Sequence, residues 1–309
     1  MRSSASLTRH PLWKRLRRDH WLYLMLLPGV LYFVLFRYAP MYGLLISFQD
    51  FQPFLGFANS KWVGFTHFER FFSDPAFTKL FLNTFILAIY NIVFFFPLPI
   101  VLALMLNEVR VKAYQRFVQT IVYIPHFVSW VVVVGLAYIF LSTDGGIVNE
   151  ILLKLGFNEI DFLLSKSWFR FLVTSEVIWK ETGWGTIIFL AALAGVDQEQ
   201  YEAAKIDGAN RWRMMWHITL PAIRSTIITL LILRLGSFMD SGFEQIFLML
   251  NAMNREVGEV FDTYVYMVGI QNGQFSYSAA IGLFKSVIGL VLVMGANNLA
   301  KRWGEDGIY

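Results

Sequence analysis

Long apolar runs alternate with polar segments along this chain. A helix rises about 1.5 Å per residue, so roughly 20 mostly apolar residues are needed to cross about 30 Å of hydrocarbon. Six runs are long enough, and Gly, Pro, Asn and Asp are frequent between several of them. The predicted spans are residues 22–48 (interrupted by Arg37), 80–106, 119–141, 169–194, 223–248 and 277–299. The pattern predicts an all-α membrane protein with about six transmembrane helices.

The composition supports this fold class. Of 309 residues, 56% are hydrophobic and 16% are charged, and the mean hydropathy is +0.52. A soluble core of this length would need more polar residues to cover it. Cysteine is absent, which excludes disulfides and thiolate metal sites. We expect one membrane domain at residues 22–299, between an N-terminal arm (1–21) and a tail (300–309).

Basic residues are unevenly distributed between the two sets of loops. The shorter loops carry most of the Lys and Arg, a bias that marks the cytoplasmic side. The longer, opposite loops hold only Lys61, Arg70, Lys154, Lys166 and Arg255. Both termini and residues 201–221 are therefore predicted to be cytoplasmic. The residues on that side are Arg2, Arg9, Lys14, Arg15, Arg17, Arg18, Arg110, Lys112, Arg116, Lys205, Arg211, Arg213, Lys301 and Arg302.

The cationic arm and first span also have the layout of a signal peptide. No small-x-small cleavage site follows Phe36, and apolar sequence resumes at Tyr38, so we expect a retained anchor. Topology and attraction to anionic lipid explain the arm better than nucleic-acid binding, since the chain carries no motif that reads nucleic acid.

The segment YEAAKIDGANRWRMMWHITLP, residues 201–221, is polar although apolar spans flank it. Asp197 followed by Gln200 fits an N-cap and capping box that starts a helix. Gly208 ends this helix, because glycine most easily adopts the left-handed conformation beyond a helix terminus. A second helix is predicted near Asn210, and Pro221 opens the fifth span where a missing N–H costs little. The pattern predicts a helix-turn-helix on the cytoplasmic face.

Periodicity alone leaves two functions open for this helix-turn-helix. It can be an interfacial helix whose apolar side chains dip into lipid headgroups, or a helix that lies in a partner's groove. The apolar side chains are Trp212, Met214, Met215 and Trp216.

The order of fixed residues in this segment resembles the EAA signature of permease subunits in bacterial ABC importers. That signature reads EAA, three residues, Gly, nine residues, Ile, one residue, Leu and Pro. Each fixed position is filled, by Glu202, Ala203, Ala204, Gly208, Ile218, Leu220 and Pro221. The segments YLMLLPGVLYFVLFRYAPMYGLLISFQDF, TYVYMVGIQNGQFSYSAAIGLFKSVIGL and KRWGEDGIY are similar to polysaccharide-type permeases within the carbohydrate importers that include the maltose system. The resemblance covers essentially the whole chain.

The resemblance implies a type I ABC importer permease fold in which residues 195–222 form the coupling loop. In that family the loop rests in a cleft of an ATP-hydrolysing subunit and carries its closure into the membrane. Glu202 would contact the ATPase, the two alanines would pack tightly, Gly208 would form the turn, and the Leu–Pro pair would anchor the loop. The implied coupling residues are Glu202, Ala203, Ala204, Asp207, Gly208, Leu220 and Pro221.

The same resemblance implies several partners in the bacterial inner membrane. These are a second homologous permease, a dimer of ATP-binding subunits and a periplasmic or extracellular solute-binding protein. Members of the group import oligosaccharides by alternating access, often uronate-containing ones, and the resemblance favours the first permease subunit of an alginate importer. The loops 49–78, 142–168 and 249–276, with Phe51, Phe54 and Trp62, are expected to face the binding protein.

Missing motifs exclude several other functions. No G-x-x-x-x-G-K-[ST] loop is present, so ATP and Mg²⁺ must be bound by a partner and no cofactor is expected in this chain. The five histidines lack metal-ligand spacing, and no Ser, His and Asp constellation can be assigned, so no enzyme is predicted. His126, inside the third span, is expected to be a packed, hydrogen-bonded helix residue rather than a substrate ligand.

Charged residues in the fourth span are expected to face protein or water. Each costs roughly 2.5–3.5 kcal/mol in hydrocarbon, so an inward orientation is favoured for Glu176, Lys180 and Glu181. Glu176 and Lys180 are spaced to pair along one helix face. Glu181 points about 100° away from Lys180, so that pair should neutralise it less well.

The fifth span is poor in apolar residues after Arg234. Asp240 and Glu244 are expected to share a helix face, with Ser237 below them, and Gly236 and Gly242 permit a kink or unwinding. Sugar hydroxyls need polar partners, and aromatic rings can stack on sugar faces. The predicted substrate pathway is Lys180, Glu181, Trp184, Arg234, Ser237, Asp240 and Glu244; the alternative for these charges is a structural network of interhelical salt bridges.

A different class of protein also fits the pattern. A non-transporting membrane scaffold or sensor would use the same helix-turn-helix to recruit a cytoplasmic partner. A secondary transporter fits less well, because an ion-coupled carrier has no need of an EAA loop.

Overall fold

The computed structural model describes residues 18–304 and 307–308, so most of the predicted basic arm lies outside the described residues. The elements in chain order are α2 (His20–Phe33), η1 (Val34–Tyr38), η2 (Ala39–Phe48), β1 (Gln49–Asp50), α3 (Gly56–Asn59), β2 (Lys61–Trp62), α4 (Thr66–Ser73), α5 (Ala76–Tyr90), η3 (Asn91–Phe95), α6 (Pro97–Asn107), α7 (Lys112–Tyr123), η4 (Ile124–Phe127), α8 (Trp130–Leu141), α9 (Ile147–Lys154), α10 (Lys166–Ala194), α11 (Gln198–Ile206), α12 (Arg211–Met214), η5 (Met215–Thr219), α13 (Leu220–Ala222), α14 (Arg224–Gly236), α15 (Phe243–Met249), α16 (Arg255–Gly258), α17 (Phe261–Val265), η6 (Tyr266–Gln271) and α18 (Phe275–Arg302).

Four helices in the described part of the chain are long and apolar enough to cross a membrane, or six if each bent pair counts as one span. The continuous helices are His20–Phe48, Ala76–Asn107, Lys166–Ala194 and Phe275–Arg302. The bent pairs are Lys112–Phe127 with Trp130–Leu141, at 100°, and Arg211–Ala222 with Arg224–Gly236, at 56°. The prediction of an all-α protein with about six spans is confirmed, but two of the spans are bent.

The third predicted span, 119–141, is wrong as a single helix. Pro125 has no N–H to continue the α-helical hydrogen bonds, the chain passes into the short 3₁₀ helix η4, and Val128 is extended. Ser129 then starts α8, because its side chain accepts a hydrogen bond from the N–H of Val132 at 3.4 Å. His126 therefore lies at the corner between two helices, and its placement inside a straight helix is corrected.

The fifth predicted span, 223–248, is also not one helix. α14 ends at Gly236, α15 begins at Phe243, and residues 237–242 between them are not helical. Gly242 has φ +81°, in the left-handed region that glycine reaches without steric cost. The predicted unwinding near these glycines is confirmed. We refer to residues 237–242 as the 237–242 segment.

The helix α10 forms the centre of the fold and packs closely against neighbouring backbone. A Cβ on Gly183 would lie 1.9 Å from the carbonyl oxygen of Val122, at the end of α7. The hydroxyl of Thr186 lies 3.3 Å from the carbonyl oxygen of Pro99 in α6. Small residues thus let three helices approach closely at this crossing.

Aromatic packing and a shared carboxylate hold α4, α17 and α18 together. Phe71, Phe261 and Tyr277 are fully or almost fully buried in one cluster. Asp74 accepts hydrogen bonds from the hydroxyls of Tyr264 and Tyr277, at 3.2 and 3.1 Å. These contacts join residues more than a hundred positions apart in the chain, so they fix the first loop against the last span.

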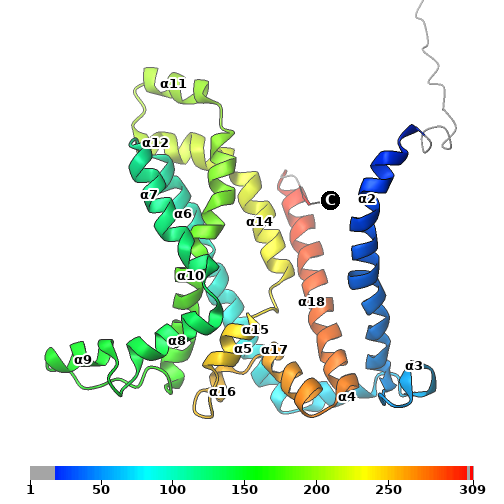
Figure 1. Cartoon of the computed structure of the whole chain (residues 1–309). Coiled ribbons are helices and arrows are strands. Elements are labelled where there is room, and N and C mark those ends of the chain that lie inside the picture. Colours follow the sequence, from blue (N-terminus) through cyan, green and yellow to red (C-terminus); the bar gives the residue numbers. More distant parts are fainter. Residues whose placement is uncertain (1–17, 305–306, 309) are drawn as a thin grey trace, which may run out of the picture.

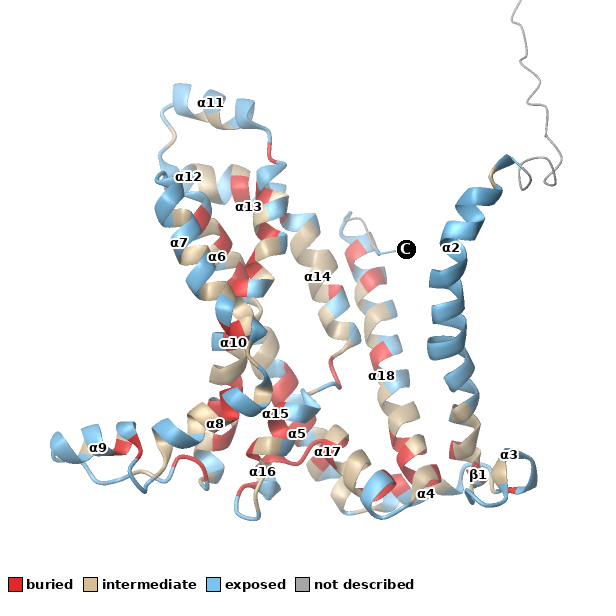
Figure 2. Cartoon of the chain, in the orientation of Figure 1, coloured by how far each residue is buried: buried red, intermediate tan, exposed pale blue. Residues whose placement is uncertain are grey.

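The first part of the first span, α2, stands apart from the rest of the molecule, whereas η2 at the end of the same span contacts α18. Figure 1 shows α2 separated from α18, and Figure 2 shows it exposed along nearly its whole length. None of its residues is buried. The short antiparallel pair β1–β2, with Gln49 opposite Trp62, follows this span.

The elements gather at two opposite ends of the molecule. Figure 1 places α11, the start of α2 and the C-terminal end of α18 at one end, which we call the α11 end. Helices α3, α4, α9 and α16 lie at the other, the α9 end.

Candidate functional site

The first candidate site is the loop 195–222 at the α11 end. Asp197 starts α11, since its carboxylate accepts a hydrogen bond from the N–H of Glu199 at 3.0 Å. At the other end, Gly208 has φ +74°, and the N–H of Ala209 donates to the carbonyl of Ala204 at 2.9 Å. This bond closes the helix in the Schellman manner. The predicted N-cap and glycine turn are confirmed.

The second helix of the loop begins where the sequence predicts. The side chain of Asn210 accepts a hydrogen bond from the N–H of Arg213 at 2.8 Å and so caps α12. The hydroxyl of Tyr201 donates to that of Thr219 at 3.0 Å, which ties α11 to the chain entering α13. Val196 and Ile223 are buried together beneath the loop. The loop is therefore a preformed helix-turn-helix.

The loop presents its signature residues to the outside. Trp212 and Trp216 are 70% and 60% exposed. Ala204 and Leu220 are half-buried, and the remaining predicted coupling residues are exposed: Glu202, Ala203, Asp207, Gly208 and Pro221. The structure thus brings these residues together in one projecting loop, and none of the described residues outside the loop covers α11 (Figures 1 and 2).

The second candidate site lies in the middle of α10, at the corner between α7 and α8. Nδ1 of His126 lies 2.7 Å from Oε2 of Glu181, and Oε1 of Glu181 lies 3.4 Å from Nζ of Lys180. The Lys180 ammonium group also donates to the carbonyl of His126. The His126 ring stacks on Trp184, with centroids 4.3 Å apart. Lys180, Glu181 and Trp184 are therefore brought together, as predicted, around a histidine.

The predicted pairing of Glu176 with Lys180 is wrong. Glu176 instead accepts a hydrogen bond from Nε2 of Gln245 at 2.7 Å. The carboxylate next to Lys180 is that of Glu181, although successive side chains on a helix point about 100° apart. Both side chains turn toward His126, at the corner that approaches this part of α10. The sequence carried a signal for that corner in Pro125 and Ser129, a helix breaker followed by a cap.

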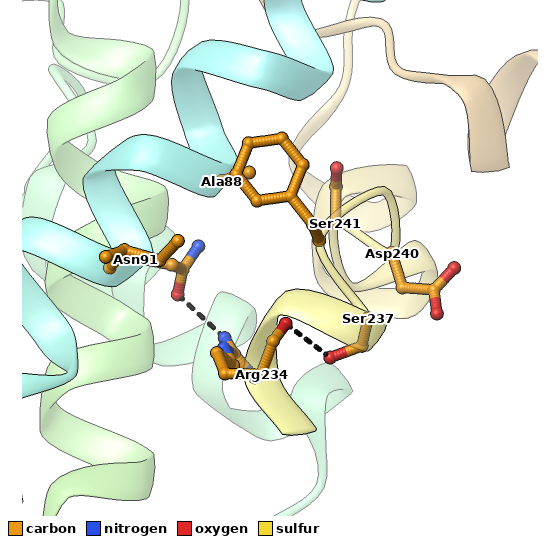
Figure 3. Close-up of a pocket in the computed structure, with 8 residues that line it drawn as sticks. Ala88, Asn91, Arg234, Ser237, Asp240 and Ser241 are labelled. Atoms are coloured by element: carbon orange, nitrogen blue, oxygen red, sulfur yellow. Dashed lines mark hydrogen bonds between the residues drawn. The ribbon is translucent and has the colours of Figure 1, made fainter. Parts of the chain in front are cut away.

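The remaining residues of the predicted pathway lie in the 237–242 segment or beside it, in α14 and α15. Nη2 of Arg234 donates to Oδ1 of Asn91 at 3.2 Å, and the hydroxyl of Ser237 donates to the carbonyl of Arg234 (Figure 3). A small cavity of about 10 Å³, room for one water molecule, lies between these residues and Asp240. Arg234, Ser237 and Asp240 thus lie together as predicted.

Asp240 and Glu244 do not share a helix face, which corrects the sequence expectation. Asp240 belongs to the non-helical segment, and Glu244 lies in the first turn of α15, beyond the left-handed Gly242. Asp240 instead pairs with Lys285 of α18 at 3.0 Å. In Figure 3 its carboxylate points away from Arg234 and Asn91.

Among the described residues, no group of three or more His, Asp or Glu side chains could hold a metal ion. What the sites offer is hydrogen-bond donors, aromatic faces and paired charges inside a largely apolar protein.

Comparison with known proteins defines the class. The chain belongs to the family of binding-protein-dependent transport system inner membrane components, whose model matches residues 95–305. It is an ABC importer permease and a multi-pass membrane protein.

Among its relatives, protein LplB of Bacillus subtilis (strain 168) is 57% identical over 294 residues, covering 95% of this chain and 92% of that protein. The polygalacturonan/rhamnogalacturonan transport system permease protein YteP of the same organism is 57% identical over 295 residues, covering 96% and 92%.

Solved structures give the same fold. A chain of a bacterial alginate ABC transporter, in complex with an alginate pentasaccharide-bound periplasmic protein, superposes with a TM-score of 0.89 and 41% identity. That superposition covers 97% of this chain and 100% of the other. The type I ABC importer permease fold implied by the EAA signature is confirmed.

Proposed function

We propose that this chain is the permease subunit of an ATP-driven importer of uronate-containing oligosaccharides. The observation that carries the proposal is the exposed helix-turn-helix of the loop 195–222, in which every fixed position of the EAA signature is filled. The acidic character of the substrate is supported by the relative that transports polygalacturonan and rhamnogalacturonan and by the similar alginate transporter.

The motor is a separate ATP-binding subunit, present as a dimer, that docks on the loop 195–222. The preformed turn at Gly208 gives α11 a fixed direction, and exposed Glu202, Ala203 and Trp212 are available for contact. ATP and Mg²⁺ bind in that partner, because this chain has no phosphate-cradling loop. The loop and both termini are then cytoplasmic, which agrees with the excess of Lys and Arg in those segments.

A second homologous permease completes the membrane part. The exposed apolar surface of α2 is a suitable face for it, since lipid or another helix must cover these side chains. The solute-binding protein docks at the α9 end, on the loops 49–78, 142–168 and 249–276, where exposed Phe54 and Trp62 lie.

The substrate passes the polar groups at the corner between α7 and α8, where they meet α10, and then those of the 237–242 segment. Trp184 offers a ring for sugar stacking, and Glu181, Ser237 and Arg234 offer hydrogen-bond partners. Alternating access follows if closure of the ATPase pushes α11, and the Tyr201–Thr219 bond carries that push into α13 and α14.

The test is reconstitution of the chain with its second permease, ATPase and binding protein in liposomes. ATP-dependent uptake of labelled oligogalacturonate or alginate oligosaccharide is expected, together with substrate-stimulated ATP hydrolysis. If the assembled complex hydrolyses ATP but moves no oligosaccharide, the chain is a scaffold or sensor and the proposal fails.

A further inference from the structure

Lys285, in α18, lies between two carboxylates from different parts of the chain. Its Nζ is 3.0 Å from Oδ1 of Asp240, in the 237–242 segment, and also contacts Oδ1 of Asp262, in the first turn of α17. The lysine side chain is only 11% exposed. A nearly buried ammonium group needs an anionic partner, because burying an unpaired charge is costly. One carboxylate would satisfy this need, and Lys285 has two.

The two carboxylates are held differently. Asp262 is 19% exposed, and its second oxygen accepts the backbone N–H of Ser241 at 3.1 Å. Asp240 is 67% exposed and belongs to the non-helical 237–242 segment, in which its own N–H donates to the carbonyl of Ser237 at 2.9 Å. Asp262 is therefore a fixed partner of Lys285, whereas Asp240 can leave the lysine and be hydrated.

A cavity of about 330 Å³ opens beside this pair. Its lining residues are Gly236, Met239, Asp240, Gly282, Lys285 and Ser286. Sites for small ligands start near 300 Å³, so a sugar ring fits. The glycines leave part of the wall without side chains, while Lys285 and Ser286 supply a cation and a hydroxyl. By contrast, Lys180 is 7% exposed and its ammonium group is turned to the carbonyl of His126.

We propose that Lys285 is a receptor for the carboxylate of the transported sugar, and that a uronate replaces Asp240 on its ammonium group. The proposal rests on the proposed function and assigns its acid specificity to this residue. The lysine keeps two anionic neighbours throughout, because one carboxylate arrives as another leaves. A neutral sugar has no group that can make this exchange.

The exchange also links substrate binding to the broken fifth span. Asp240 ties the 237–242 segment to α18 through Lys285. Once Asp240 is released, the segment keeps its bond from Ser241 to Asp262 and the packing of Phe238 and Met239 in the cluster that includes residues of α18, but it loses its charged contact with that helix. Non-helical segments of this kind absorb the dihedral changes of hinge motions. Substrate binding at Lys285 therefore removes one charged contact between α18 and the segment that follows α14, while the apolar contacts between the two helices remain.

The experiment measures binding of labelled oligogalacturonate to the purified permease–ATPase complex in nanodiscs. The solute-binding protein is left out, so that its own affinity does not set the result. The comparison ligand is the same oligomer with its carboxyl groups reduced, which makes it neutral. Asp240→Asn should tighten binding of the acidic oligomer by about threefold to tenfold, because the substrate no longer competes with an aspartate. Lys285→Gln should weaken it by about tenfold, and neither change should alter binding of the neutral oligomer.

Lys79→Gln is the matched control, since Lys79 also pairs with a carboxylate, that of Glu259 at 3.2 Å, but lies outside the cavity. It should leave the acidic-to-neutral ratio unchanged. Unchanged or weaker acidic binding in Asp240→Asn would overturn the proposal, as would equal losses for both oligomers in Lys285→Gln. Asp240 is exposed, so its variant folds even if the Lys285 variant does not. A wild-type transporter that imports both oligomers equally well refutes this inference alone, whereas one that imports neither refutes the proposed function.

Discussion

The loop 195–222 and the 237–242 segment both interrupt the helical chain near α14, but they are stabilised in opposite ways. The loop is held by bonds between near neighbours, from Asp197 to Glu199, Ala204 to Ala209 and Asn210 to Arg213. The 237–242 segment is held from a distance, by Asp262 and Lys285. A locally bonded unit keeps its shape while it is displaced. A segment held by distant helices changes its shape when those helices move. The loop is therefore suited to transmit motion as a rigid unit, and the segment is suited to act as a hinge.

The largest expected effect comes from breaking the shape of the loop at Gly208. Gly208→Pro forces φ to about −65° where the chain has +74°, so α11 is turned out of its direction. We expect ATP-driven uptake to fall by at least about 100-fold, while ATP hydrolysis loses its stimulation by substrate; a 100-fold change corresponds to about 2.7 kcal/mol.

The matched control is Gly195→Ala, at a glycine with φ −86° that ends α10 just before the loop. Its nearest neighbouring atom would be 3.4 Å from the new Cβ, so this change should be tolerated. Normal substrate-stimulated hydrolysis in Gly208→Pro would show that the loop is not a lever.

Removing the contacts of Glu181 with Lys180 and His126 should lower the stability of the protein more than its coupling to ATP hydrolysis. Glu181→Gln removes the charge that faces both Lys180 and His126, and leaves the nearly buried Lys180 without its carboxylate. Loss of a partner for a buried polar group costs about 1–3 kcal/mol, and the melting temperature of the purified complex should fall accordingly.

A double-mutant cycle with Lys180→Met tests the interaction directly. If the two charges interact, the double variant should recover about 0.5–3 kcal/mol relative to the sum of the single changes. Additive losses would show that Glu181 and Lys180 do not interact, so that the Glu181 carboxylate is not held by Lys180 and can contact a substrate.

The close approach of α10 and α7 gives a comparable but simpler test. Gly183→Ala places a Cβ 1.9 Å from the Val122 carbonyl oxygen, so the helices must separate, at a cost of about 1–3 kcal/mol. Gly282→Ala, in α18, meets nothing within 4 Å and should be neutral or slightly stabilising. Thermal unfolding of both variants in detergent distinguishes them, and equal melting temperatures would rule out this tight crossing.

The smallest effect is expected at an exposed long-range contact. Lys166 pairs with Glu256 at the α9 end and holds the pKa of that carboxyl below its ordinary value of 4.5. A lowered pKa in the folded protein means that the contribution to stability is present above about pH 4.5 and is lost as the pH falls through the folded pKa. Glu256→Gln should therefore lower the melting temperature slightly at pH 7, and the difference from the wild type should shrink as the pH falls below 4.5 through the lowered pKa. Both side chains are exposed, so the ion pair should contribute little. A large effect at pH 7 would show that joining residues far apart in the sequence matters more to this contact than burial does.

The same contrast explains what the sequence could predict. Asp197, Gly208 and Asn210 act on residues within a few positions, so caps and turn were readable from the chain. The partners of Glu176 and Asp240 come from other helices, and Lys180 contacts the corner at His126. Helical spacing therefore wrongly predicted both the Glu176–Lys180 pair and the face shared by Asp240 and Glu244. His126 shows the intermediate case, since its corner had a local signal while its contact with Glu181 had none. The predicted roles of the coupling and pathway residues stay predictions until the variants are measured.

The separate position of α2 bears on how the subunit is made. The described part of the chain gives α2 almost nothing to pack on, because no residue of this helix is buried. The whole span to which α2 belongs, His20–Phe48, is 29 residues long with a mean hydropathy of 1.7, which is enough to enter a bilayer without the later helices. A newly inserted copy therefore exposes the apolar side chains of α2 to lipid and to any other membrane helix that meets it.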